Sequence, residues 1–195
     1  MENKLTKMIG VAAGISGAMA AGLAIGRKMR ASVPEEVRAF EYAEGGLADP
    51  ENGMPANCLP AYEEAAANGI GIIADVRLCH DGVPVLFKDE YFMDHCGEEG
   101  VVEGSPWEWI CHYKLDGTEY TIPGLMAMFN VVDDRVPIIL NLHSGNDNVD
   151  ALCDSVLARM DAYEGLVLVT STEKKILRWF KENAPEYITV GFGKI

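Results

Sequence analysis

Residues Glu44 to Asp89 read EGGLADPENGMPANCLPAYEEAAANGIGIIADVRLCHDGVPVLFKD, and this stretch decides the fold. Its first half predicts a helix over residues 59–67, with Asn57 as the candidate N-cap. Its second half predicts strands over residues 70–78 and 84–88. A helix set between strand-like runs is typical of an α/β domain.

The rest of the chain repeats this alternation. The run VPIILNL at 136–142 is nearly all apolar, as expected for a parallel strand buried on both faces. Further strands are predicted at 39–43, 165–170 and 187–192. Helices are predicted from Ser105-Pro106 into WEWICHY and over 123–132, 149–163 and 173–183. Alternating strands and helices predict a parallel α/β sheet.

Many weak matches to one known pattern lie in order along residues 40–195. They are Gly46, Pro55, Asn57, Asp81, Gly82, Pro84, Val85, Gly117, Ile122, Pro123 and Leu125. In order and spacing they resemble the glycerophosphodiester phosphodiesterase family. The resemblance implies a TIM-barrel-like (β/α) domain with an accessory strand at 84–88, so that about five barrel strands remain out of the eight of a full barrel.

The reactive positions of that family are largely substituted. Glu44 and Gly45 stand where the resemblance places an acid/base histidine and a phosphate-binding arginine, and Lys88 stands where it places a second histidine. The resemblance also places a metal-binding Glu-x-Asp pair at residues 73–75. Ile73 replaces the glutamate of this pair, whereas Asp75 retains its aspartate. The scaffold residues of the family are therefore present, whereas its catalytic positions are occupied by Glu44, Gly45 and Lys88 and the resemblance identifies no catalytic residue.

Two more family positions lie at the end of the strand predicted at 136–142. Asn141 replaces a metal-binding glutamate, and His143 replaces a lysine that faces the substrate. The resemblance thus leaves Asp75 as a remnant metal ligand and His143 as a candidate substrate-binding residue. We expect a pseudoenzyme that acts as a binding or scaffolding module. The alternative is a weakly active phosphoric diester hydrolase in lipid metabolism.

Substituted residues could also form a rebuilt site. Glu44 and Asp89 are candidate oxygen ligands for Mg²⁺ or Ca²⁺ beside Asp75, with Lys88 or His143 as a proton carrier. The simpler interpretation is that Asp75 and Asp89 bond loop backbone and that Glu44 is solvated. We expect no cofactor, and Mg²⁺ or Ca²⁺ only where a residual site exists.

The charge of the chain excludes one class of partner. The chain has a net charge of −14, and residues 31–195 hold 29 acidic against 11 basic residues. Such a domain should be repelled by nucleic acid.

Five cysteines, an odd number without C-x-x-C spacing, favour a reducing compartment.

An uncharged run of 19 residues, Met8 to Gly26, predicts a single transmembrane helix within an anchor at 1–30, followed by a connector at 31–38 and the domain at 39–195. Basic residues after the run favour a cytoplasmic domain, although an outward-facing domain stays open. A cleaved signal peptide, with Ala18-Met19-Ala20 as the cleavage site, is the alternative.

Small residues form a stripe along that predicted helix. They recur every four residues, at Gly10, Gly14, Ala18, Gly22 and Gly26. Such stripes let two helices approach closely in lipid, although they also occur in weak lipid-facing anchors. Together with the open flank of a five-strand sheet, the stripe predicts a homo-oligomer.

Overall fold

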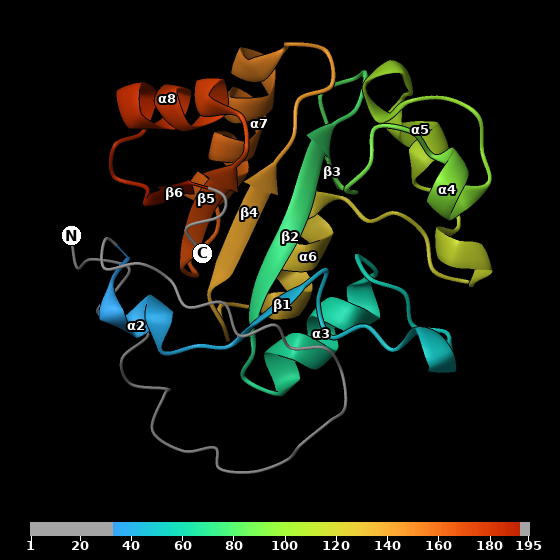
Figure 1. Ribbon diagram of the computed structural model, residues 1–195, viewed down its shortest axis with the longest axis horizontal. Helices are drawn as coiled ribbons and strands as arrows, with labels where there is room; N and C mark the ends of the chain where they lie inside the picture. Colours follow the sequence, from blue (N-terminus) through green and yellow to red (C-terminus); the bar gives the residue numbers. More distant parts are fainter. Residues whose placement is uncertain (1–32, 192–195) are drawn as a thin grey trace.

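The protein is described here by a computed structural model of residues 33–191 (Figure 1). Its sheet has the strand order β1-β2-β4-β5-β6, and each neighbouring pair is parallel. The strands are β1 (Tyr42–Glu44), β2 (Gly71–Leu78), β4 (Ile138–Leu142), β5 (Val167–Ser171) and β6 (Thr189–Gly191). The predicted parallel α/β sheet is confirmed.

The short strand β3 (Pro84–Leu86) runs antiparallel to β2. Val76 of β2 pairs with Leu142 of β4 and also with Leu86 of β3. Because a strand has two edges, β3 must lie on the edge of β2 opposite β4, beyond the end of β1. It is an accessory strand, as the family resemblance implied.

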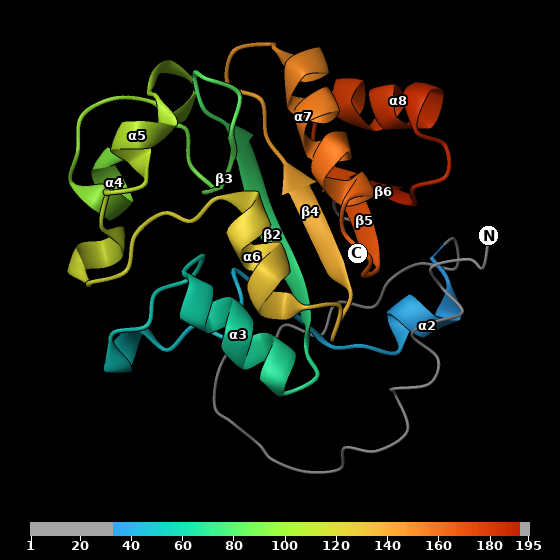
Figure 2. The same cartoon turned by 180° about the vertical axis from the view of Figure 1, so that it is seen from behind.

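Four helices cover the outer face of the sheet (Figure 2). They are α3 (Leu59–Ala67), α6 (Leu125–Val132), α7 (Val149–Asp161) and α8 (Lys174–Asn183). Apolar side chains from these helices and from the strands form the main core. Burial of this apolar area drives the assembly of the layers.

The helix predicted at 59–67 has those bounds, but Asn57 is not its N-cap. Cys58 occupies the cap position and makes no side-chain capping bond. Asn57 instead has a left-handed backbone, with φ of 63°, and its Oδ1 accepts a hydrogen bond from the Tyr62 hydroxyl. An asparagine tolerates this conformation better than most residues.

A loop-rich insertion lies between β3 and α6. It contains α4 (Met93–Cys96), η2 (Val102–Gly104), α5 (Trp107–Ile110) and η3 (Leu115–Gly117). Phe87, Phe92 and Ile110 contribute to its separate apolar cluster. The helix predicted from Ser105-Pro106 is thus confined to one short turn.

Inward-facing side chains form a third apolar cluster. Ile73, Ile139 and Leu168 are in register on β2, β4 and β5, and they pack with Val33 and Val37. Val37 belongs to α2 (Glu35–Arg38), which Figure 1 places below the tails of the strands. These side chains form an apolar layer directly beneath the polar residues at the carboxyl ends of the strands.

Within residues 33–191, no helix is long and apolar enough to cross a bilayer. The predicted span Met8 to Gly26 and its stripe of small residues lie outside the described residues.

Candidate functional site at the carboxyl ends of the strands

One row of polar residues crosses the inner face of the sheet. Asp75 of β2 pairs in register with Asn141 of β4, which pairs with Thr170 of β5. Side chains two residues apart on a strand share a face, so this row lies one layer above Ile73, Ile139 and Leu168. All three members of the row are buried. The register therefore brings Asp75 next to the end of β4, where His143 follows Leu142.

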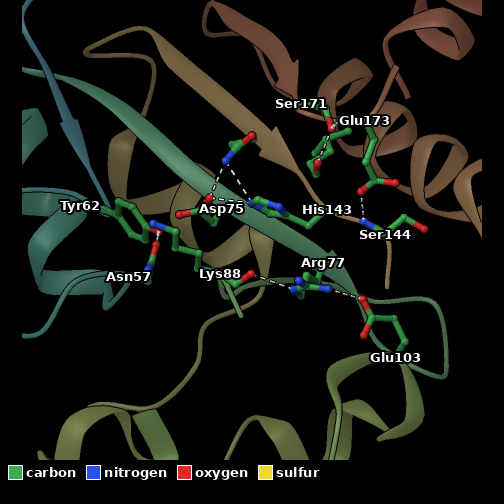
Figure 3. A network of polar contacts seen from close by, with 12 residues as sticks. Asn57, Tyr62, Asp75, Arg77, Lys88, Glu103, His143, Ser144, Ser171 and Glu173 are labelled. Carbon is green, nitrogen blue, oxygen red and sulfur yellow. Dashed lines mark hydrogen bonds and ion pairs between the residues drawn. The ribbon is translucent and has the colours of Figure 1, made fainter. Parts of the chain in front are cut away.

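Asp75, Asn141 and His143 form a compact polar cluster, of which Figure 3 labels Asp75 and His143. Asp75 Oδ1 lies 2.7 Å from Asn141 Nδ2 and 2.7 Å from His143 Nε2. An ionised Asp75 only accepts hydrogen bonds, so Asn141 Nδ2 donates to it, and His143 donates to it in the tautomer that carries the proton on Nε2. Asn141 Nδ2 also lies 3.0 Å from His143 Nε2. We call these three residues the Asp75 cluster.

Two side-chain oxygens of the polar row lack hydrogen-bond partners. Asn141 Oδ1 and Thr170 Oγ1 are buried and make no hydrogen bond within the described part of the chain. Tyr62 lies on the Asn57 side of Asp75 (Figure 3), and burial, followed by the charge of Asp75, raises its pKa well above the usual range. Its neutral hydroxyl donates to Asn57. The side chains that surround the Asp75 carboxylate on the inner face of the sheet are thus mainly neutral and polar.

A buried ion pair lies beyond the Asp75 cluster. Arg77 Nη1 lies 2.7 Å from Glu103 Oε1, and their side chains are 11% and 8% exposed. Arg77 Nε also donates to the carbonyl of Lys88, and Glu103 Oε1 accepts the N–H of Gly145. The Arg77–Glu103 pair therefore joins β2 to the segment after β3, the insertion and the loop after β4.

Sequence reasoning missed the Arg77–Glu103 pair. A signal was present, because Arg77 is a charged residue within an eight-residue strand whose members are all buried. It also follows Asp75 by two positions, which places both side chains on the inner face. Nothing in the sequence pointed to Glu103, whose place depends on the path of the insertion.

The structure places the other predicted site residues outside the Asp75 cluster. Glu44 ends β1 and is exposed. Gly45 has φ of 68°, and a Cβ there would lie 2.8 Å from Ala56 Cβ, so a glycine suits this turn for steric reasons. Lys88 is exposed, and its carbonyl accepts the bond from Arg77.

Asp89 contacts His95 rather than any member of the Asp75 cluster. His95 Nε2 lies 3.1 Å from Asp89, and its Nδ1 lies 2.7 Å from Asp116. The hydrogen bond to Asp116, followed by the charges of Asp116 and Asp89, raises the pKa of His95. Across residues 33–191, no group of three or more His, Cys, Asp or Glu side chains is arranged to hold a metal ion.

Comparison with known proteins gives both sequence and fold relatives. No family model matches the chain. The curated protein "Probable glycerophosphodiester phosphodiesterase 2" of Mycobacterium tuberculosis is 27% identical over 124 residues, which are 63% of this chain and 45% of that protein. The chain thus spans under half the length of this relative.

Solved structures agree with that match. A phosphodiesterase of Oleispira antarctica, in complex with the product sn-glycerol-3-phosphate, has a TM-score of 0.70 at 21% identity. The alignment covers 77% of this chain and 64% of that one. A glycerophosphodiester phosphodiesterase of Agrobacterium tumefaciens has a TM-score of 0.63 at 20% identity, covering 76% and 64% of the two chains.

The sheet is a parallel α/β arrangement, and its match to these solved structures assigns it a TIM-barrel-like fold. Within that class, the chain is similar to the glycerophosphodiester phosphodiesterases in both sequence and fold. The resemblance drawn from the sequence is confirmed.

Proposed function

We propose that this chain is a glycerophosphodiester phosphodiesterase-like binding module that has lost metal-dependent hydrolysis. The observation that carries the proposal is the state of Asp75, whose Oδ1 accepts hydrogen bonds from Asn141 and His143. A hard divalent cation needs several oxygen ligands, with charge supplied by carboxylates. Here the Asp75 carboxylate faces two N–H donors, and Ile73 belongs to the apolar layer beneath it. These residues do not fit a divalent cation.

The chemistry of the reaction supports the same proposal. Hydrolysis of a phosphodiester needs positive charge on the phosphoryl oxygens, an activated nucleophile and a proton for the leaving alkoxide. Glu44 and Gly45 supply neither an imidazole nor a guanidinium at the positions where the resemblance places the acid/base histidine and the phosphate-binding arginine. Loss of one electrostatic contributor commonly lowers kcat by about 10²-fold or more. Several such losses in one unit leave little beyond binding.

An assay of the full-length chain tests this proposal. Glycerophosphocholine, glycerophosphoglycerol and bis(p-nitrophenyl) phosphate would be incubated with Mg²⁺, Ca²⁺ or Mn²⁺, beside an Asp75→Ala variant. We expect both proteins to match the protein-free background. Metal-dependent turnover by the wild type that disappears in Asp75→Ala would overturn the proposal.

A second candidate is a weak phosphodiesterase that uses His143 as its base. It is favoured by the 2.7 Å contact between Asp75 and His143 Nε2, since a carboxylate that orients an imidazole is a common arrangement for general bases. This candidate predicts turnover that resists EDTA and is lost in His143→Asn. Adding EDTA and the His143→Asn variant to the assay therefore separates the two candidates.

We also propose that Met8 to Gly26 anchors the domain to a membrane, with the domain on the cytoplasmic side, and that the anchors self-associate. The support is the uncharged run, the basic residues that follow it and the stripe of small residues. We propose no nucleic-acid partner because the domain is strongly acidic.

A further inference from the structure

The chain enters the described domain at the amino-terminal end of the sheet. Val33 and Val37 are buried and pack into the apolar layer beneath the polar row. The Tyr42 hydroxyl donates to the Val37 carbonyl. Tyr42 and Gly71, the first residues of β1 and β2, are in register. The entry point is therefore fixed at the end of the sheet opposite the carboxyl ends of the strands. We call that opposite end, with its polar row, the mouth, and the loops around it the rim.

A short linker separates this entry point from the proposed membrane anchor. Residues 27–32 lie between Gly26, the last residue of the uncharged run, and Val33. The chain from Gly26 to Val33 spans at most about 25 Å when fully extended. The polar headgroup region takes up roughly 6 Å of this length on one side of a bilayer. About 19 Å of reach therefore remains between the headgroup surface and Val33.

The wall of the domain is as tall as this reach. β2 runs from Gly71 to Leu78, and a strand of this length rises about 23 Å along its own axis. With the strand tilt of about 36° that is typical of such barrels, its height is roughly 19 Å. The loop between β4 and α7 rises beyond the arrowheads of the strands (Figure 1). The rim therefore stands farther from Val33 than the linker can reach beyond the headgroups.

The charge of the insertion favours the same orientation. Residues 88–121 hold nine acidic residues against two basic ones. Figure 2 shows the insertion beside the arrowhead end of β2, on the mouth side of the domain. Arg27, Lys28 and Arg30 follow the proposed anchor directly. Anionic headgroups attract such basic residues by about 1 kcal/mol each, whereas they repel an acidic surface.

We propose that the mouth faces away from the bilayer and takes its ligand from the surrounding water. The proposal rests on the binding module and the anchor proposed above, and it adds the source of the ligand. A dissolved glycerophosphodiester and the headgroup of a phospholipid present the same phosphodiester chemistry. Only the dissolved compound can reach the Asp75 cluster in this orientation. The lipids of the bilayer that holds the chain are excluded.

Fluorescence energy transfer from the domain to the bilayer tests this orientation. The full-length chain in phosphatidylcholine vesicles would carry one donor fluorophore, with the acceptor on the lipid headgroups. Asn146→Cys places the donor on the rim, and Asn68→Cys places it between α3 and β2, at the amino-terminal end. Both positions are exposed. We expect the donor at 68 to lie nearer the bilayer than the donor at 146 by roughly the height of the wall, about 20 Å.

Both labelled proteins share one background. Cys96→Ser and Cys111→Ser remove the two half-buried thiols, and the other three cysteines are buried.

A longer linker is the matched control. Twelve Gly and Ser residues inserted after Arg30 add a mean reach of roughly 20 Å. The domain can then turn over, so the difference between the two donors should fall by at least about half. An unchanged difference would contradict the linker as the cause of the orientation.

The source of the ligand has its own arm. Glycerophosphoglycerol is added to the water, or phosphatidylglycerol is included in the bilayer, and the emission of the donor at 146 is followed. We expect a saturable change with the dissolved compound that the donor at 68 does not show, and no such change with the lipid. A change with the lipid alone, or with neither compound, would overturn the assigned source.

Two results would overturn the orientation. They are transfer from the donor at 146 that equals or exceeds transfer from the donor at 68, and loss of the full-length chain from the vesicles. Neither result bears on hydrolysis, which the turnover assay with Asp75→Ala measures separately.

Discussion

His143 Nε2 lies 2.7 Å from Asp75 Oδ1, and the same oxygen accepts a hydrogen bond from Asn141. Asp75→Leu removes this acceptor and leaves two donors unpaired at a buried position. We expect a loss of about 1–3 kcal/mol in the free energy of unfolding. Asp75→Asn keeps an acceptor oxygen and should lose less. Urea denaturation of both variants checks this order, and equal losses would contradict it.

The Arg77–Glu103 pair gives a second stability prediction. Arg77→Met leaves the buried Glu103 charge without its partner, which should cost about 3 kcal/mol or more. The double variant Arg77→Met with Glu103→Leu removes both charges and should be more stable than Arg77→Met alone. A double-mutant cycle by urea denaturation measures the coupling. A coupling near zero would show that the pair is not important for stability.

His95 predicts a pH dependence within the insertion. Asp116 and Asp89 raise its pKa above the ordinary value of about 6.5. The stabilisation from the imidazolium is therefore fully present below about pH 6.5 and is lost as the pH rises through the folded-state pKa. Since His95 is 44% exposed, we expect less than about 1 kcal/mol. His95→Gln should remove this component from unfolding curves measured between pH 5 and 9, and an unchanged pH profile would contradict the assignment.

The N-terminal run gives a prediction in membranes. We expect the full-length chain to remain in the membrane pellet after carbonate extraction, because the uncharged run is long enough to span a bilayer. Gly14→Leu with Gly22→Leu should leave the protein in that pellet but weaken its self-association in detergent, measured by light scattering. Leu substitutions at Val11 and Ile15 are the matched control. Release of the wild type by carbonate, or equal association of all variants, would contradict these proposals.

The strands and long helices could be predicted from the sequence because their apolar spacing is regular. The helix at 59–67 has the expected bounds, and the strands differ from those expected by a few residues. The N-cap at Asn57 could not be judged from residue type alone. Its side chain bonds Tyr62 because the tight turn gives Asn57 a left-handed backbone.

The site was predictable only where residues share a strand face. The family positions Asp75, Asn141 and His143 come together because β2 and β4 are parallel and in register. The Arg77–Glu103 pair and the Asp89–His95–Asp116 contacts depend on the insertion between β3 and α6. Its path is set by a small apolar cluster around Phe92 rather than by a regular pattern.

Calorimetry of divalent cation binding tests the central claim most directly. The full-length wild type and Asp75→Asn would be titrated with Mg²⁺ and with Ca²⁺ at neutral pH. With Asp75 bonded by Asn141 and His143, we predict that any binding is no tighter than roughly millimolar and is unchanged in Asp75→Asn. Micromolar binding by the wild type that is lost in Asp75→Asn would show that the site still holds a metal ion, and would contradict the account.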